Sequence, residues 1–371
     1  MTSYRIFLIA AIACNSVIAD DTLKRIGDFA LLDQNGQQHQ LRKYRGKDAA
    51  VFLSVNEQCS KSPAILDKYK LLRKAAQTVN LVFFAIDSTS HKKPVHPSSS
   101  YATVDFDLPI LTDDSLLITE GLGMKRPGDL VIVEPNSGDV FYYGTIDSQV
   151  SLQLDALDFA LPDLAAAIVQ LLSDINSKGI DYEPAWLERK TDGCEPFLLG
   201  ARSNRKSPDY ATEVAPILKE KCVHCHAQGG IAPFAMGSHE AVKGWSAMIR
   251  EVLLTRRMPP MQVDPRVRHF ANANYIEPSE MRTLIHWIDD GAPFNNRLDD
   301  PLRDVPSNAT LWQLGEPDYI LQLPAFRVPA TGVLDYENVT MDLPLTKDVW
   351  VKSVHYIPGD RRALHHLMSY I

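Results

Sequence analysis

The sequence lacks any cluster of basic residues, and beyond its N-terminal stretch it contains no apolar run long enough to cross a membrane. Lys and Arg total 38 against 46 Asp and Glu, which gives a formal net charge of -8. We therefore expect no nucleic-acid partner and no integral membrane segment in the mature protein. The 371 residues are 45% hydrophobic and 23% charged, a composition typical of two or three soluble globular domains.

The N-terminal residues have the pattern of an export signal. A basic residue precedes the apolar run Ile6–Ala13, and Ala19 provides a small residue at the expected cleavage site. This pattern predicts a signal peptide over residues 1–19, too short to anchor the mature chain, and therefore a periplasmic or secreted protein. Cys14 leaves a lipoprotein as the alternative, although Ala11 fits a lipoprotein signal poorly.

Cysteine is also scarce, and two of the five cysteines belong to one short motif. The motif is Cys222-Val223-His224-Cys225-His226. On a helical turn, positions i, i+3 and i+4 share one face, so one face can carry two thioether bonds to haem vinyl groups and direct an imidazole at the iron. This is the pattern of c-type haem attachment. It predicts haem c bound covalently by Cys222 and Cys225, with His226 as an axial ligand.

Two other kinds of site can use this cysteine spacing. A zinc knuckle would need a second Cys/His pair at finger spacing, and the sequence offers none that fits well. A thioredoxin-like redox pair would follow a strand, whereas the residues before Cys222 predict a helix. The predicted export also favours haem, because covalent haem attachment takes place outside the cytoplasm.

Residues 20–175 predict an α/β region. Its expected elements are a strand ending in the Asn35-Gly36 turn, buried strands at Ala49–Val55 and Leu81–Ile86, a helix opened by Pro63, a hairpin joining Leu130–Val133 to Val140–Tyr143, and a last helix at Leu164–Leu172. The order β-β-α-β-α-β-β-α, with Cys59 at a strand-to-helix turn, resembles a thioredoxin or redoxin fold. The resemblance implies that Pro127 is a cis-proline facing Cys59.

This resemblance is incomplete at Cys59, because Ser62 stands where a Cys-x-x-Cys motif has its second cysteine. Cys59 is a candidate catalytic thiol, since a helix N-terminus can lower the pKa of a thiol, but reversible dithiol chemistry needs a resolving thiol. Cys194, in a polar linker expected over residues 176–206, is a candidate for that thiol or for a structural partner of Cys59. The alternative is a degenerate redoxin scaffold that docks a partner or spaces the domains.

Residues 207–297 predict a helical region around the haem motif. The expected helices are one capped by Ser207, kinked or broken at Pro216 and leading to Cys222, and a third over Pro278–Asp290 that Gly291 terminates. Between them, a second helix is expected to start near Ser238, with Val242, Trp245 and Ile249 on its apolar face. Helices on both sides of a haem motif describe a small, all-α class I cytochrome c.

Several short runs carry a resemblance to a known family. They are Val214–Leu218, Cys222–His226, Ile231–Phe234, Met258–Pro260 and Trp287–Pro293. Together they look like bacterial multidomain proteins in which a redoxin domain precedes a cytochrome c domain and a domain similar to copper type II, ascorbate-dependent monooxygenases. The resemblance covers nearly the whole mature chain. It implies that Met258, from the Met-Pro-Pro run, is the sixth ligand of the haem iron, with Met261 as the alternative.

In such a protein, residues 308–371 are the N-terminal part of the copper domain, a partial all-β, jelly-roll-like module. The apolar stretches that predict antiparallel strands are Tyr319–Leu323, Val339–Leu343 and Val349–Ile357. His365 and His366 match the tandem histidine that binds one copper in that family, and neutral imidazoles suit copper. The family's third histidine and second copper site have no counterpart here, so an unligated strand end is the alternative.

The leading functional prediction is an exported c-type cytochrome with a degenerate redoxin domain. It would pass single electrons between its haem and either a redox partner protein or a C-terminal copper domain. Two alternatives stay open at this point. One is a truncated, haem-linked copper monooxygenase, and the other is a haem-bearing scaffold whose redoxin domain only binds a partner. Whether the chain is itself an enzyme is left undecided by the sequence.

Overall fold

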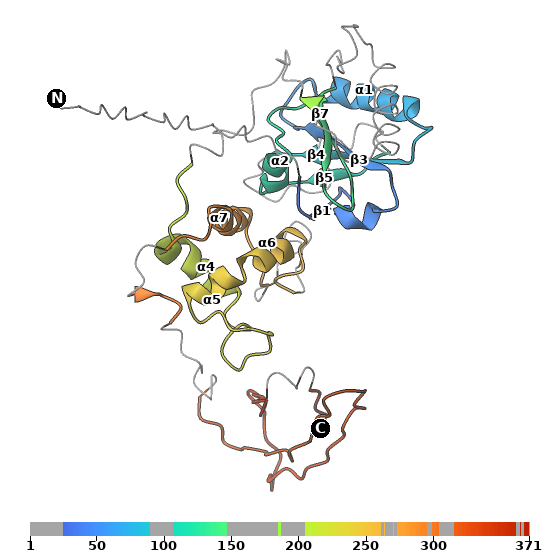
Figure 1. Cartoon of the computed structure of the whole chain (residues 1–371). Coiled ribbons are helices and arrows are strands. Elements are labelled where there is room, and N and C mark those ends of the chain that lie inside the picture. Colours follow the sequence, from blue (N-terminus) through green and yellow to red (C-terminus); the bar gives the residue numbers. More distant parts are fainter. Residues whose placement is uncertain are drawn as a thin grey trace, which may run out of the picture. The chain divides into compact units, whose positions relative to one another are not determined.

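The computed structural model describes residues 25–89, 107–146, 185–186, 205–260, 263, 270, 273–294, 299–303, 315–360, 364 and 367–370. The chain divides into two compact units, and Figure 1 labels the elements of both. The first takes in Met1–Gly27, Tyr44–Ile86 and Ile118–Pro196, and the second Asp28–Lys43, Asp87–Leu117 and Phe197–Ile371. Within the described residues, no helix is both long and apolar enough to span a membrane.

The first unit is built on a mixed sheet. Its strands lie in the order β4-β3-β6-β7-β8. Their bounds are β3 (Ala49–Val55), β4 (Leu81–Asp87), β6 (Asp129–Val133), β7 (Val140–Thr145) and β8 (Ala185–Trp186). Every residue of β3 is buried, as a strand covered on both faces requires. β6 pairs antiparallel with β3 and with β7, and β8 pairs parallel with β7.

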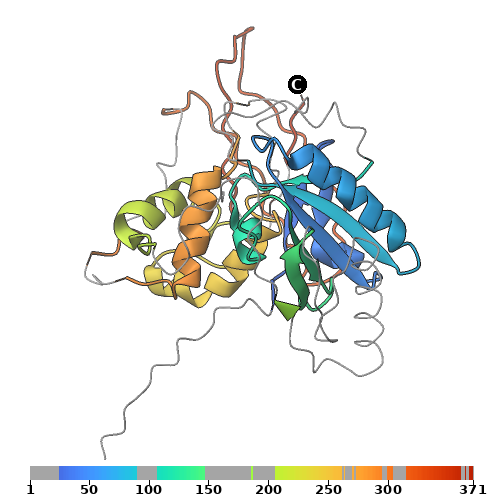
Figure 2. The same cartoon turned by 90° about the horizontal axis from the view of Figure 1, so that it is seen from above.

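Helix α1 (Ser62–Ala75) connects β3 to β4, its neighbour in the sheet, which is the crossover that a parallel pair needs. Pro63 stands in the first turn of α1, where its missing N–H costs nothing. The helix packs on β3 (Figure 2) through the predicted stripe of Ile65, Leu66, Tyr69 and Leu72. A β-α-β unit with an antiparallel hairpin beside its first strand is the topology of a thioredoxin-like fold, so this part of the sequence prediction is confirmed.

Tyr69 joins α1 to the middle of this sheet. Its ring is fully buried, and its hydroxyl lies 2.8 Å from the Val51 carbonyl oxygen and 3.0 Å from that of Phe84. Phe84 in turn stacks on Phe52 at a centroid distance of 5.4 Å. Burial raises the pKa of Tyr69 well above its usual value, so the phenol stays a neutral donor in the core.

One expectation for the first unit is wrong. The Arg126–Pro127 bond is trans: Met258–Pro259 is the cis peptide of the described chain. The loop before β6 turns by other means, since Asp129 accepts hydrogen bonds from two backbone N–H groups, at Lys125 and Arg126, and Gly128 adopts a φ of 95°. Within the predicted linker over residues 176–206, the structure describes Ala185 and Trp186, which form β8 and pair with β7.

The second unit combines a small set of strands with a helical body. The strands lie in the order β2-β1-β5. β1 and β2 pair antiparallel on either side of the predicted Asn35-Gly36 turn, where Gly36 has a φ of 78°. The bounds of these strands are β1 (Ala30–Leu32), β2 (Gln38–Gln40) and β5 (Ile110–Thr112). Two short helices, η1 (Leu41–Tyr44) and α2 (Leu117–Gly121), each contain a point at which the sequence passes from one unit to the other.

The helical body of the second unit consists of five segments. They are the π-helical turn η4 (Tyr210–Val214) and the helices α4 (Ala215–Lys221), α5 (His239–Gly244), α6 (Ser246–Leu254) and α7 (Pro278–Asp289). The predicted break at Pro216 is confirmed, because η4 gives way to α4 one residue before it. Asp209 rather than Ser207 caps this segment, since its carboxylate accepts from the Thr212 N–H.

The second predicted helix is divided in two. It begins after Ser238, near the predicted start, but α5 ends at Gly244 and α6 begins at Ser246. The residue between them, Trp245, was expected on the inward face with Val242 and is instead 41% exposed. The third predicted helix is α7, which ends at Asp289. Gly291 follows it with a φ of 86°, as expected for a glycine that terminates a helix.

A buried carboxylate ties the helical body together. Asp300 accepts from the Tyr210 hydroxyl at 3.0 Å, from the His239 backbone N–H at 2.6 Å and from the Leu302 backbone N–H at 3.0 Å. The Tyr210 ring stacks on Trp287 with a centroid distance of 5.5 Å. These contacts join η4, α5 and α7 to the residues beyond α7, and they satisfy a carboxylate that would otherwise be costly to bury.

Residues 315–360 form no strand, so the three strands predicted there are wrong. The apolar side chains of this stretch lie on the surface: Val333, Tyr336 and Trp350 are 84% exposed or more. A strand needs a neighbour to accept its backbone hydrogen bonds and a layer to cover its apolar face. The described residues supply neither here, and the all-β module is not confirmed.

We expect Tyr69→Phe to lower the free energy of unfolding by about 1–2 kcal/mol, because the change removes a buried hydroxyl donor from two carbonyl oxygens and leaves the ring in place. Urea denaturation followed by fluorescence measures this. Tyr319→Phe is the matched control, since Tyr319 is 56% exposed. Equal stabilities for the two variants would contradict the role given to the Tyr69 hydroxyl.

Candidate functional site

The cysteine motif lies on a single turn that continues from α4. Helix α4 ends at Lys221, and Cys222 donates to the Leu218 carbonyl as its C-cap. The Cys222 carbonyl oxygen then accepts from the Cys225 N–H at 3.1 Å and from the His226 N–H at 3.0 Å. These i+3 and i+4 bonds give the turn helical geometry, in which positions i, i+3 and i+4 share one side.

His226 is buried, at 7% exposure, and its ring is held by one hydrogen bond. Nδ1 lies 2.9 Å from the Phe234 carbonyl oxygen. A carbonyl only accepts, so Nδ1 carries the proton and Nε2 of the neutral ring keeps its lone pair. Desolvation lowers the pKa of His226, against the opposing effect of this bond. The neutral, metal-binding form is therefore favoured at neutral pH.

The two cysteines of the motif are free thiols, and both are half-buried. Desolvation, reinforced by the nearby Cys225, raises the pKa of Cys222 to about 12. The leading cysteine of a thioredoxin-type pair has its pKa lowered instead, so Cys222 does not have the properties of a redox nucleophile. Within the described residues, no three His, Cys, Asp or Glu side chains come together as a metal site.

The loop that follows the motif folds back over it. Ala232 donates to the Cys225 carbonyl at 3.1 Å, and Met236 donates to the His226 carbonyl at 2.7 Å. Gly230 makes this close return possible, because a Cβ on it would lie 2.4 Å from the Cys225 carbonyl oxygen. The loop thereby brings the Phe234 carbonyl to His226, and it covers the imidazole.

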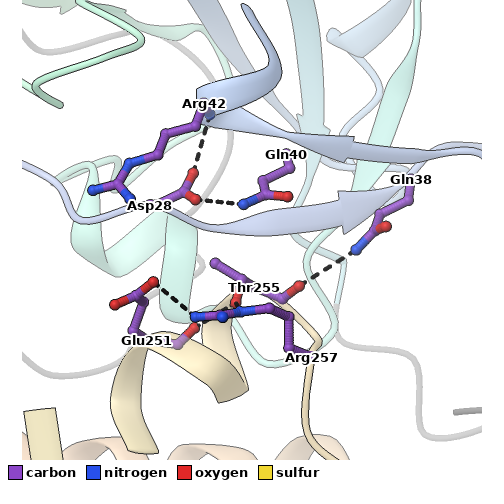
Figure 3. A network of polar contacts seen from close by, with 7 residues as sticks. All are labelled: Asp28, Gln38, Gln40, Arg42, Glu251, Thr255 and Arg257. Carbon is purple, nitrogen blue, oxygen red and sulfur yellow. Dashed lines mark hydrogen bonds and ion pairs between the residues drawn. The ribbon is translucent and has the colours of Figure 1, made fainter. Parts of the chain in front are cut away.

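Met258 lies in a loop anchored to the end of α6. The Arg257 and Met258 N–H groups both donate to the Val252 carbonyl oxygen, at 2.8 and 3.1 Å. The Arg257 side chain donates to Glu251 and to the Thr255 hydroxyl, and Gln38 of β2 donates to the Thr255 carbonyl oxygen at 3.4 Å (Figure 3). Met258 itself is 36% exposed. The structure therefore gives the predicted ligand a fixed backbone, and its role as an iron ligand stays a prediction.

The donor set of the motif fits a covalently attached haem. Two free thiols on one turn suit the two vinyl groups, and a neutral imidazole with its proton held on Nδ1 keeps a lone pair on Nε2. A carbonyl that holds this proton is the kind of partner that orients metal-bound histidines. Sequence reasoning found Cys222, Cys225 and His226, but gave no role to the Phe234 carbonyl.

Cys59 lies in the loop between β3 and α1, as predicted, but it is 5% exposed and already disulfide-bonded. Because Cys222 and Cys225 are free, the sequence leaves Cys14 and Cys194, both outside the described residues, as its partner. Ser62 has a structural role: its hydroxyl donates to the Asn56 carbonyl oxygen at 2.6 Å and is buried. Ser62, at the position of the second cysteine in a Cys-x-x-Cys motif, thus holds the loop through a hydrogen bond to its backbone.

Several predicted residues lie outside the described residues. These are Cys194, the alternative ligand Met261, and the candidate copper ligands His365 and His366, together with the signal peptide over residues 1–19 and the helix at Leu164–Leu172. The copper site and the signal peptide stay predictions.

Gly230→Ala should impair the site, because its new methyl group would clash with the Cys225 carbonyl and push the loop off the motif. We expect at least a severalfold loss of covalently bound haem and a lower melting temperature. Gly237→Ala is the control, since nothing lies within 4 Å of the added Cβ there. Haem absorbance per chain and circular dichroism melting measure the two effects, and equal behaviour of the variants would refute the close return of the loop.

Cys59 should resist alkylation in the native, oxidised protein and react only after reduction, because its sulfur is bonded and buried. Peptide mapping by mass spectrometry before and after reduction measures this and identifies the partner cysteine.

We also expect no thioredoxin-like reduction of insulin. Insulin reduction that disappears in Cys59→Ser would contradict this expectation.

No protein-family model and no curated protein matches this chain. Among solved structures it is similar to the pneumococcal exposed lipoprotein thioredoxin of Streptococcus pneumoniae strain TIGR4, at 22% identity over 40% of this chain and 99% of that one, with a TM-score of 0.30. It is also similar to peroxidoxin BcpB of Mycobacterium tuberculosis, at 18% identity over 41% and 95% of the chains and a TM-score of 0.31. Identities and TM-scores this low say nothing about the activity of this chain. The thioredoxin-like assignment depends on the strand order described above.

Proposed function

We propose that this protein is an exported c-type cytochrome that transfers single electrons through a haem held by Cys222, Cys225 and His226. One observation carries the proposal: two free thiols and a neutral imidazole share one turn, and the Nδ1 proton of His226 is fixed on the Phe234 carbonyl. Haem iron, when bound, supplies a one-electron Fe(III)/Fe(II) couple.

Each residue of the motif has a separate task in this proposal. Cys222 and Cys225 would hold the cofactor through thioether bonds to its two vinyl groups, and such bonds would survive unfolding. Because both cysteines belong to the turn that carries His226, the cofactor would be held next to that residue. His226 would offer Nε2 to the iron, and its imidazole is buried, at 7% exposure.

Met258 is the residue that we propose as the second protein ligand of the iron. A thioether ligand would favour the reduced iron and raise the reduction potential. The loop supports this role because two successive N–H groups, at Arg257 and Met258, are bound to one carbonyl oxygen of α6. A backbone fixed in this way lowers the entropy cost of holding a flexible side chain in one place.

The thioredoxin-like region has a supporting role in the proposal. Its one candidate nucleophile, Cys59, is bonded, and Ser62 is committed to a loop hydrogen bond. We therefore assign this region to docking a redox partner rather than to thiol chemistry. Copper bound by His365 and His366 is a further candidate redox centre on the same chain.

Production in a bacterial host with haem-maturation proteins tests the proposed function. The wild-type chain should keep haem peroxidase staining on a denaturing gel, and the double variant Cys222→Ala/Cys225→Ala should lose it, because no thioether can form. Cys59→Ser is the matched cysteine control and should keep full staining. Staining that survives the double change would overturn the assignment.

Met258→Ala, made in the same host, separates attachment from axial ligation. The variant should keep its covalent haem but lose the sulfur-to-iron absorption band of the oxidised protein. If the band persists, the sixth ligand is another residue and the attachment site is unaffected.

A further inference from the structure

We propose that Trp245 is a positioning residue for the axial imidazole, acting through Phe234. The inference rests on the proposed haem function and adds a residue to that site that neither the motif nor its spacing suggests. It starts from a large aromatic ring, 41% exposed, placed at the break between α5 and α6.

Three rings follow one another from the surface to the site. The Trp245 ring stacks on Phe234, with a centroid distance of 4.6 Å and an angle of 19° between the planes. The Phe234 ring lies 4.5 Å from the His226 ring at 55°. The same residue, Phe234, also provides the carbonyl oxygen that accepts the His226 Nδ1 proton. Phe234 is therefore held by its ring on one side and binds the imidazole with its backbone on the other.

The break in the helix is what puts Trp245 in this place. Had α5 and α6 been continuous, the residue would have lain with Val242 and Ile249 on the inward stripe, as the sequence pattern predicts. At the break it takes a φ of -99° and a ψ of 4°, serves as the C-cap of α5 and leaves the core. Its indole then covers Phe234, a residue of the loop rather than of the helices. The aromatic contact with Phe234 compensates for the interrupted helix and the exposed ring.

The consequence for the site concerns the strength of the His226 hydrogen bond. Outside the bonds at Ala232 and Met236, the loop near Phe234 has this stack as its side-chain anchor. Loosening the anchor lets the carbonyl move away from Nδ1. A weaker bond makes the imidazole a poorer donor to iron, which favours the reduced state.

The test uses the holoprotein with Trp245→Leu, which keeps apolar bulk but cannot stack. At a fixed applied potential near the wild-type midpoint, the ratio of reduced to oxidised haem should rise about threefold, as expected for the loss of one aromatic contact. The His226 Nδ1 proton, followed by NMR in the reduced protein, should exchange with solvent about tenfold faster. Trp245→Phe should restore most of both values, and Met248→Ala, a neighbour on α6 that is 49% exposed, should change neither.

Phe234→Leu provides a second route to the same answer, because it keeps the backbone carbonyl and removes the ring that Trp245 holds. It should shift the ratio in the same direction, and the double variant should shift it no further than either single one. If Trp245→Leu does not accumulate as a haem protein, Phe234→Leu decides the question. Wild-type ratio and exchange rate in whichever variant binds haem would overturn the inference, whereas a wild-type chain without covalent haem would instead overturn the proposed function.

Discussion

The hydrogen bond from His226 Nδ1 to the Phe234 carbonyl oxygen is the contact on which the candidate site depends. It determines which nitrogen of the ring has a lone pair, and it fixes where the loop after the motif must lie. The other features of the site follow from that requirement. Gly230 lets the loop approach the Cys225 carbonyl, and the bonds at Ala232 and Met236 hold the loop in place. The candidate site therefore consists of the five-residue motif together with the loop that follows it, up to Met236.

The contrast between the two cysteine-bearing loops shows why one fold region is given the redox role and the other is not. At Cys59 the thioredoxin-like geometry is present, but the thiol is bonded and the neighbouring hydroxyl of Ser62 is bound to the backbone. At Cys222 and Cys225 the thiols are free, and the raised pKa of Cys222 keeps it from acting as a reactive thiolate. Such thiols suit a stable covalent product better than reversible exchange.

Local patterns allowed much of the fold to be predicted. The strand β3, the helix α1 with its buried stripe, and the end of α7 at Gly291 all follow from periodicity and from residues with one preferred conformation. The errors arise where distant contacts decide. Trp245 leaves the apolar stripe of the helix, and its indole stacks on Phe234 of the loop. β8 pairs with β7 in a stretch whose sequence is polar and without periodicity. Neither partner is visible in a window of sequence around the residue concerned.

The position of Asp300 in the chain has a consequence for the order of events during biosynthesis. The carboxylate that joins Tyr210, His239 and Leu302 comes well after the cysteine motif, so the segment that closes the helical body is synthesised after the motif. On the proposed function, a nascent chain would present Cys222 and Cys225 in an open, incompletely packed state until Asp300 has been made. Covalent attachment would then precede closure, and the helical body would pack around a cofactor already in place.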